Sequence, residues 1–195
     1  MATPNPSNSP TDEELVQAAQ GGDPDAFTQL VRRHEDAVFN MSYRMLSHRE
    51  DARDLAQEVF LTVHDRLPEF RGESQFRTWL FRVVVNRCRD ELRRRKTVKH
   101  TRPASLDPES PTPARDPSPE AAARGRELEE IVAACMEELP EELREMLVLR
   151  DVQDLAYDEI AQVADVPVGT VRSRLSRART QLATLLAPIL EGGGA

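Results

Sequence analysis

Apolar residues recur every three or four positions through most of this chain, and this pattern predicts a series of α-helices. Helix starts are indicated by capping signals at Thr11 with Glu14, Asp23 with Pro24, and Ser47 with Glu50. Gly21-Gly22 should end the first helix and Pro68 the third, and a long basic helix is expected from about 74 to 96. No alternating pattern typical of β-strands appears.

Residues 98–125 interrupt the helical pattern. Six of the chain's fourteen prolines lie there, among Ser, Asp and Glu, so the segment cannot bury enough surface to order itself and is predicted to be extended. Residues 1–10 are predicted to be disordered, and 188–195, which end in three glycines and an alanine, to fray. We therefore expect an all-α protein with two small helical domains, 11–97 and 126–187, joined by a flexible linker.

Residues 157–182 predict two short helices joined by a tight turn. When the second is wound at about 100° per residue, its inward apolar residues are Val171, Leu175, Ala178 and Leu182, and Ser173, Ser176, Arg177 and Thr180 face outward between Arg172, Arg174 and Arg179. Small polar groups flanked by guanidiniums suit a DNA major groove. The alternative is a solvated charged helix, which would normally interleave acids with the arginines. We interpret the segment as a helix-turn-helix.

The basic helix at 74–96 carries a second polar stripe. Opposite its apolar face, which holds Phe81, Val84, Val85, Cys88 and Leu92, lie Arg82, Asn86, Arg89 and Arg93. Four of the nine aromatic residues fall within 70–81, and aromatics beside arginines suit unpaired bases. Phe76 and Phe81 are nevertheless expected in the core, whereas Trp79 could serve either role. Asn86 is a weak helix former that can pair with a base edge.

Charge is unevenly distributed. The chain has a net charge of −8, yet residues 71–102 hold eleven Lys/Arg against three acids, and 172–179 hold four arginines and no acid. The remainder has eleven Lys/Arg against 31 Asp/Glu, a balance of −20. A protein that finds DNA unaided would spread positive charge more widely. We infer that another molecule delivers this protein to DNA.

Other chemistries find little support. Cys88 and Cys135 match no metal-ligand spacing and are interpreted as reduced packing residues rather than a disulfide. The four histidines lack HExxH spacing, and no glycine loop could cradle phosphates, so we predict no metal, cofactor or catalytic site. No segment reaches membrane-spanning length and no signal peptide is visible, which predicts a soluble, cytoplasmic protein.

Two non-enzymatic alternatives explain less of the chain. A conventional helix-turn-helix activator or repressor would account for 157–182 but not for the aromatic, basic helix, and it should dimerise on a two-fold site. An adaptor that binds only proteins would leave both arginine stripes unexplained.

Four motifs in order resemble those of the bacterial extracytoplasmic-function (ECF) sigma factors, transcription initiation factors with two domains. They are Asp51–Phe60, Phe70-Arg71-Gly72 with Phe76–Leu80, Val85-Asn86-Arg87, and Tyr157–Ala161 with Pro167–Arg174. The resemblance covers about 12–186 and implies a sigma domain 2 at 11–97 and a sigma domain 4 at 126–187. It also implies a role in a stress response and inhibition by an anti-sigma factor.

The resemblance further implies which residues bind each partner. Domain 2 should dock on the clamp helices of core RNA polymerase through Asp54, Gln57 and Glu58. It should melt the minus-ten promoter element and hold a flipped base, using Phe70, Arg71, Gly72, Glu73, Ser74, Gln75, Trp79, Arg82, Asn86, Arg89 and Arg93. Domain 4 should bind the flap tip and read the minus-thirty-five element as duplex through Thr170, Arg172, Ser173, Arg174, Ser176, Arg177 and Arg179.

Overall fold

The computed structural model describes residues 9–99 and 131–192, and within these ranges every regular element is a helix. The elements in chain order are α1 (Asp12–Gln20), α2 (Pro24–Leu46), α3 (Arg49–Arg66), the 3-10 turn η2 (Leu67–Glu69), α4 (Phe76–Lys99), α6 (Glu141–Leu147), the π-helical turn η3 (Val148–Val152), α7 (Tyr157–Ala164) and α8 (Val168–Gly192). Residues 131–137 are also helical. The predicted all-α class is confirmed. The predicted N-terminal disorder and most of the predicted linker lie outside the described residues.

Two of the three predicted helix starts are correct. The Thr11 side chain accepts from the Glu14 amide and the Glu14 side chain accepts from the Thr11 amide, which completes the capping box, and Asp23 caps α2. The predicted Ser47–Glu50 box is wrong, because Ser47 takes a left-handed conformation (φ 55°) that ends α2. His48 is the N-cap instead, and its Nδ1 accepts from the Asp51 amide at 3.3 Å.

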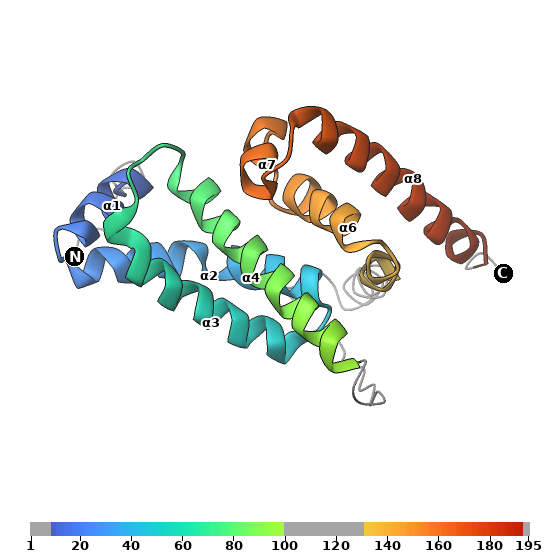
Figure 1. The fold of residues 1–195 in the computed structure, drawn as a ribbon, viewed down its shortest axis with the longest axis horizontal. Coiled ribbons are helices and arrows are strands. Elements are labelled where there is room, and N and C mark those ends of the chain that lie inside the picture. Colours follow the sequence, from blue (N-terminus) through green and yellow to red (C-terminus); the bar gives the residue numbers. More distant parts are fainter. Residues whose placement is uncertain (1–8, 100–130, 193–195) are drawn as a thin grey trace, which may run out of the picture.

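The N-terminal region, α1–α4, encloses an apolar core. On α4 the predicted inward residues Phe81, Val84, Val85 and Cys88 are fully buried, and Figure 1 shows α4 lying across α2 and α3. Phe76 is buried as well, as its sequence context predicted. The short helix α1 is attached to α2 by Asp12, whose carboxylate contacts His34 Nε2 at 2.8 Å.

The C-terminal region, residues 131–192, contains the predicted helix-turn-helix. Helix α7 ends at Asp165 in a left-handed conformation (φ 57°), and α8 begins at Val168. Val171, Leu175 and Ala178 are buried, as the helical wheel predicted. Helix α8 continues to Gly192 through Pro188, whereas the sequence predicted fraying from 188. Proline removes one backbone donor and crowds the carbonyl four residues earlier, and at Pro188 this disturbance falls only on the last turns of α8.

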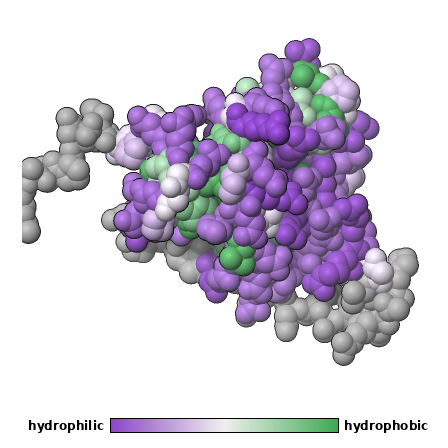
Figure 2. Space-filling view, turned by 60° about the vertical axis from the view of Figure 1, so that its left-hand side comes forward, coloured by the Kyte–Doolittle hydropathy of each residue, from purple (hydrophilic) through white to green (hydrophobic). Residues whose placement is uncertain are grey.

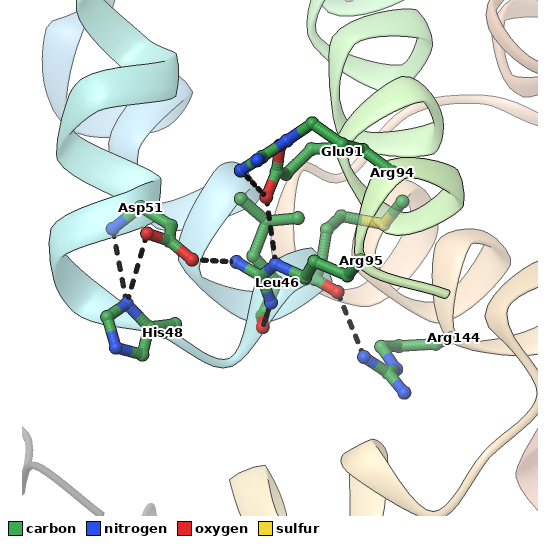
Figure 3. Close-up of polar contacts among 8 residues, drawn as sticks. Leu46, His48, Asp51, Glu91, Arg94, Arg95 and Arg144 are labelled. Atoms are coloured by element: carbon green, nitrogen blue, oxygen red, sulfur yellow. Dashed lines mark hydrogen bonds and ion pairs between the residues drawn. The ribbon is translucent and has the colours of Figure 1, made fainter. Parts of the chain in front are cut away.

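The two regions pack directly on each other, an arrangement that the sequence did not predict. Figure 1 shows α4 between the N-terminal helices and the pair α6–α7, and α4 contacts α7 while α2 contacts α6 and η3. Arg144 on α6 is buried and donates from Nη1 to the Met45 carbonyl at 2.9 Å (Figure 3). Gln153 Nε2 donates to the Ala37 carbonyl at 3.2 Å. These contacts join two segments predicted to be independent.

Both cysteines are free and buried, and Cys88 gives a direct test of how α4 packs. Burial raises the pKa of the Cys88 thiol to about 12, although a hydrogen bond with Ser42 opposes the shift. Since only the thiolate reacts, alkylation of Cys88 by iodoacetamide at pH 8 should be at least ~100-fold slower in the native chain than in guanidinium. Fast native labelling of Cys88, located by mass spectrometry of peptides, would show that α4 does not pack this way.

Candidate nucleic-acid interface

Several of the predicted minus-ten residues line a groove at the start of α4, which Gln162 and Asp165 of the C-terminal region also border. Trp79 is half-buried, with its ring centroid 5.1 Å from that of Phe70 and 5.9 Å from that of Phe76. Trp79 therefore borders the core while its other side faces this groove of about 960 Å³. Six of the predicted DNA-binding residues line this groove: Phe70, Arg71, Glu73, Ser74, Trp79 and Arg82. The groove is large enough to admit a nucleobase.

The loop at 70–75 is held in place by a contact that the sequence did not indicate. Gln20, at the end of α1, donates from Nε2 to the carbonyls of Leu67 and Phe70, both at 2.8 Å. Gly72 takes a left-handed φ of 72°, a conformation that glycine adopts without strain. Arg71, Glu73 and Gln75 are exposed around it. The loop is therefore anchored at its start and presents polar side chains to solvent.

The remaining residues of the polar stripe on α4, Asn86, Arg89 and Arg93, also face the C-terminal region. A second groove, of about 590 Å³, is lined on one side by Asn86, Arg89 and Arg93. The other side carries the acids of α6 with a predicted minus-thirty-five residue, namely Glu141, Glu142, Glu145 and Arg174. The structure thus brings together parts of two DNA sites that were predicted separately.

Glu145 forms a bidentate ion pair between the two regions. Its carboxylate accepts from Arg89 Nε and Nη2 at 2.8 and 2.7 Å, and only 3% of the Glu145 side chain is exposed. Burial raises the pKa of Glu145, and the ion pair with Arg89 opposes that shift. Arg89 Nη2 also donates to the Ala164 carbonyl at the end of α7, at 3.1 Å. A buried carboxylate with a forked guanidinium partner is geometrically specific as well as strong.

The outer face of α8 has the predicted character. Ser173, Ser176 and Arg177 are exposed, as are Arg172 and Arg179. Arg174 is only 20% exposed in its side chain, because it pairs with Glu142 at 2.9 Å, and Arg179 pairs with Asp151 at 2.7 Å. The Thr170 side chain is partly buried. Within the part of the chain that the structure describes, Arg172 and Arg177 form no ion pair, unlike Arg174 and Arg179.

Comparisons with known proteins decide the family. Residues 30–98 match the family model of sigma-70 region 2, and residues 129–182 match that of sigma-70 region 4. The RNA polymerase sigma-H factor of Pseudomonas aeruginosa is 36% identical over 192 residues, which are 92% of this chain and 95% of that protein. The ECF RNA polymerase sigma-E factor of Escherichia coli (strain K12) is 38% identical over 189 residues, 92% and 96% of the two chains. This chain belongs to the ECF sigma factors.

One solved structure shares the overall fold of this chain. The structure of CnrH in complex with the cytosolic domain of CnrY superposes with a TM-score of 0.68 at 28% identity and covers 91% of this chain and 97% of that one. The sigma factor therefore acts in transcription initiation, and the two matched regions include nearly all of α4 and the first part of α8. Within the described residues, no helix is both long and apolar enough to cross a membrane.

A third surface of the sigma factor lies on α3. Asp54, Gln57 and Glu58 are exposed, and Asp54 and Glu58 border a groove of about 370 Å³ between α3 and α4. Asp51, Asp90 and Glu91 line the same groove with Arg87 and Arg94, so acids predominate. No metal site is formed here or elsewhere in the described ranges by three or more His, Cys, Asp or Glu side chains.

Leu61 is a candidate contact residue that the sequence reasoning missed. Figure 2 shows a mainly hydrophilic face of the molecule with small, separate hydrophobic patches, so a large exposed apolar side chain is unusual. Leu61 is 67% exposed, the highest fraction among the large hydrophobic side chains of the described residues. It follows Gln57 by four residues and Glu58 by three, and therefore lies on their face of α3. The sequence did contain one indication of this: Leu61 is apolar but does not fit the helical spacing of Leu55, Val59 and Val63, which are buried.

Arg94 and Arg95, near the end of α4, form ion pairs beside the α3 surface. The sequence indicates only their contribution to the positive charge of that helix. Arg95 lies between α3 and α4 and contacts Asp51, while its Nε donates to Glu91 at 3.0 Å and its Nη1 to the Leu46 carbonyl at 2.8 Å (Figure 3). Arg94 also pairs with Glu91, which lowers the pKa of that carboxyl. Arg95 thus holds the end of α4 against the α2–α3 turn, whereas Arg94 pairs within α4 and stays largely exposed.

Proposed function

We propose that this sigma factor binds core RNA polymerase and directs it to promoters by reading two DNA elements in two physical states. The observation that carries the proposal is the presence of two basic helical surfaces of different character on one sigma-factor chain. One combines aromatic residues, a polar loop and an arginine stripe, and the other is a helix-turn-helix with a small polar crest. The first suits separated strands and the second suits intact duplex.

The minus-ten element is assigned to the start of α4 and the loop before it. The residues proposed to contact it are Phe70, Arg71, Gly72, Glu73, Ser74, Gln75, Trp79, Arg82, Asn86, Arg89 and Arg93. The groove beside Trp79 offers a ring for stacking, and the arginines offer donors for phosphates. Asn86 is exposed and supplies a donor and an acceptor for a base that has left the stack. This surface would therefore capture melted non-template strand.

The minus-thirty-five element is assigned to α8. The residues proposed to contact it are Thr170, Arg172, Ser173, Arg174, Ser176, Arg177 and Arg179. Exposed serines lie between exposed arginines, so base edges and phosphates could be contacted together in a major groove. The helix Tyr157–Ala164 would support α8 from behind, as in other helix-turn-helix proteins.

Polymerase binding is assigned to both parts of the chain. Asp54, Gln57 and Glu58 would contact the clamp helices, with Leu61 as an apolar anchor among them, and residues 126–187 would bind the flap tip. We propose residues 11–97 and 126–187 as sigma domains 2 and 4. We also propose an anti-sigma partner, as the family resemblance implies; the similar CnrH has a protein partner of its own, the cytosolic domain of CnrY. The proposed site of action is the cytoplasm, where core polymerase is found. Core polymerase, and not this chain, would catalyse RNA synthesis.

Reconstituted transcription tests the proposal. The purified chain with core polymerase should give run-off transcripts from promoters identified by sequencing RNA after overexpression, and core polymerase alone should give none. The chain alone should bind the same promoter fragments at least ~100-fold more weakly than the complex, because its surplus of acids repels DNA. Tight, sequence-specific binding by the isolated chain at physiological salt would contradict the assigned dependence on polymerase.

A further inference from the structure

The DNA-facing side of α4 is already occupied by the chain's own C-terminal region. Arg89 is paired with Glu145, and Arg82 Nη2 lies 3.9 Å from an Asp165 carboxylate oxygen. Arg77 donates to the Gln153 carbonyl, and Thr78 Oγ1 donates to Glu159 at 3.3 Å. These contacts follow α4 over more than three turns, so they form a continuous interface.

The carboxylates in this interface take the positions that DNA phosphates would need. A guanidinium binds a carboxylate or a phosphate through the same fork of N–H groups, and the two ligands cannot occupy it together. Asn86 and Arg93 face the groove whose other side carries Glu141, Glu142 and Glu145. A nucleic-acid strand entering that groove would meet these acids at close range, and like charges repel. Strand binding and the packed arrangement are therefore mutually exclusive.

We propose that the free sigma factor is closed on itself, with Glu145 as an internal competitor of promoter DNA for Arg89 and the α4 stripe. Separation of the two regions then precedes minus-ten capture. The inference rests on the proposed DNA-binding role of α4. Two of the four arginines assigned to the minus-ten element, Arg82 and Arg89, have their carboxylate partners in the other region.

A charge reversal at Glu145 tests the closed state without altering a DNA-binding residue. Glu145→Lys places a cation against Arg89 and should open the chain, and Glu145→Gln should open it in part. Glu138→Lys is the matched control, because it makes the same change of charge at an exposed position in the turn just before α6. Circular dichroism should show equal helix content in all variants at the temperature of measurement.

The first measurement is the distance between spin labels at Glu50→Cys on α3 and Asp158→Cys on α7, both exposed positions. The native chain and Glu138→Lys should give one narrow distribution, and Glu145→Lys a longer and broader one. An unchanged distribution in folded Glu145→Lys would overturn the proposed role of this residue in closure.

The second measurement is anisotropy of a fluorescent oligothymidine of about 20 nucleotides, long enough to span such a groove. Glu145→Lys should bind it about tenfold more tightly than Glu138→Lys does, because the fraction of competent molecules rises. An opened chain with unchanged affinity would overturn the competition with DNA. Adding Arg82→Ala to Glu145→Lys should weaken this binding. If it does not, the role proposed for α4 fails, while the distance measurement still decides whether the chain closes.

Discussion

The triple variant Asp54→Ala, Gln57→Ala, Glu58→Ala is expected to bind core RNA polymerase at least ~30-fold more weakly than the native chain, about 2 kcal/mol. The three side chains are exposed on the face of α3 opposite buried Leu55 and Val59, so their removal should leave the fold intact. Competition against a fluorescent native chain for core polymerase measures the loss. The melting temperature should change by less than ~2 °C, as is usual for surface substitutions.

A matched control lies on α2. Glu35→Ala, Asp36→Ala, Asn40→Ala also removes two acids and one amide from exposed helical positions. It should keep native affinity, which separates a specific surface from the effect of net charge. Leu61→Ala alone should weaken binding by about tenfold if this leucine is the apolar anchor of the interface. Native affinity in the α3 triple variant would refute the assignment of α3 to the clamp.

The Asn86→Ala variant is expected to slow promoter opening by about 30- to 100-fold while closed-complex formation stays near native. Asn86 is exposed and contributes nothing to the core, so the loss should come from one base that is no longer captured after it leaves the stack. Permanganate footprinting measures opening, and electrophoretic shift of the polymerase complex measures the closed state. A premelted template should restore opening but not base preference at the affected minus-ten position.

The Arg177→Ala variant is expected to fail at the earlier step, closed-complex formation, which Asn86→Ala leaves near native. Arg177 is exposed on α8, where a bidentate contact with a guanine discriminates by about 1–3 kcal/mol, so this variant should weaken the closed complex. A bubble placed downstream should not restore its upstream specificity. If Asn86→Ala and Arg177→Ala fail at the same step on both templates, the proposed division between strand capture and duplex reading is wrong.

Local patterns predicted most of the helices and their buried faces. Phe81, Val84 and Val85 on α4, and Val171 and Leu175 on α8, are buried as the helical wheels required. Such periodicity is reliable because a helix has one face to bury and the spacing of its apolar residues defines that face. The helix-turn-helix and the family resemblance came from the same local information. Boundaries were weaker, since Ser47 was predicted to begin a helix but ends the preceding one.

The tertiary structure alone decided the partners of the charged residues. A sequence shows that Arg89 and Glu145 are charged, but they stand 56 positions apart, and only the packing of α6 beside α4 pairs them. The same holds for Gln20, which reaches the loop at 70–75, and for Arg95, which joins the α2–α3 turn to α4. Helical periodicity follows from short-range geometry that each segment carries in its own residues. Ion pairs between distant segments depend instead on how whole helices dock, and local spacing does not encode that choice.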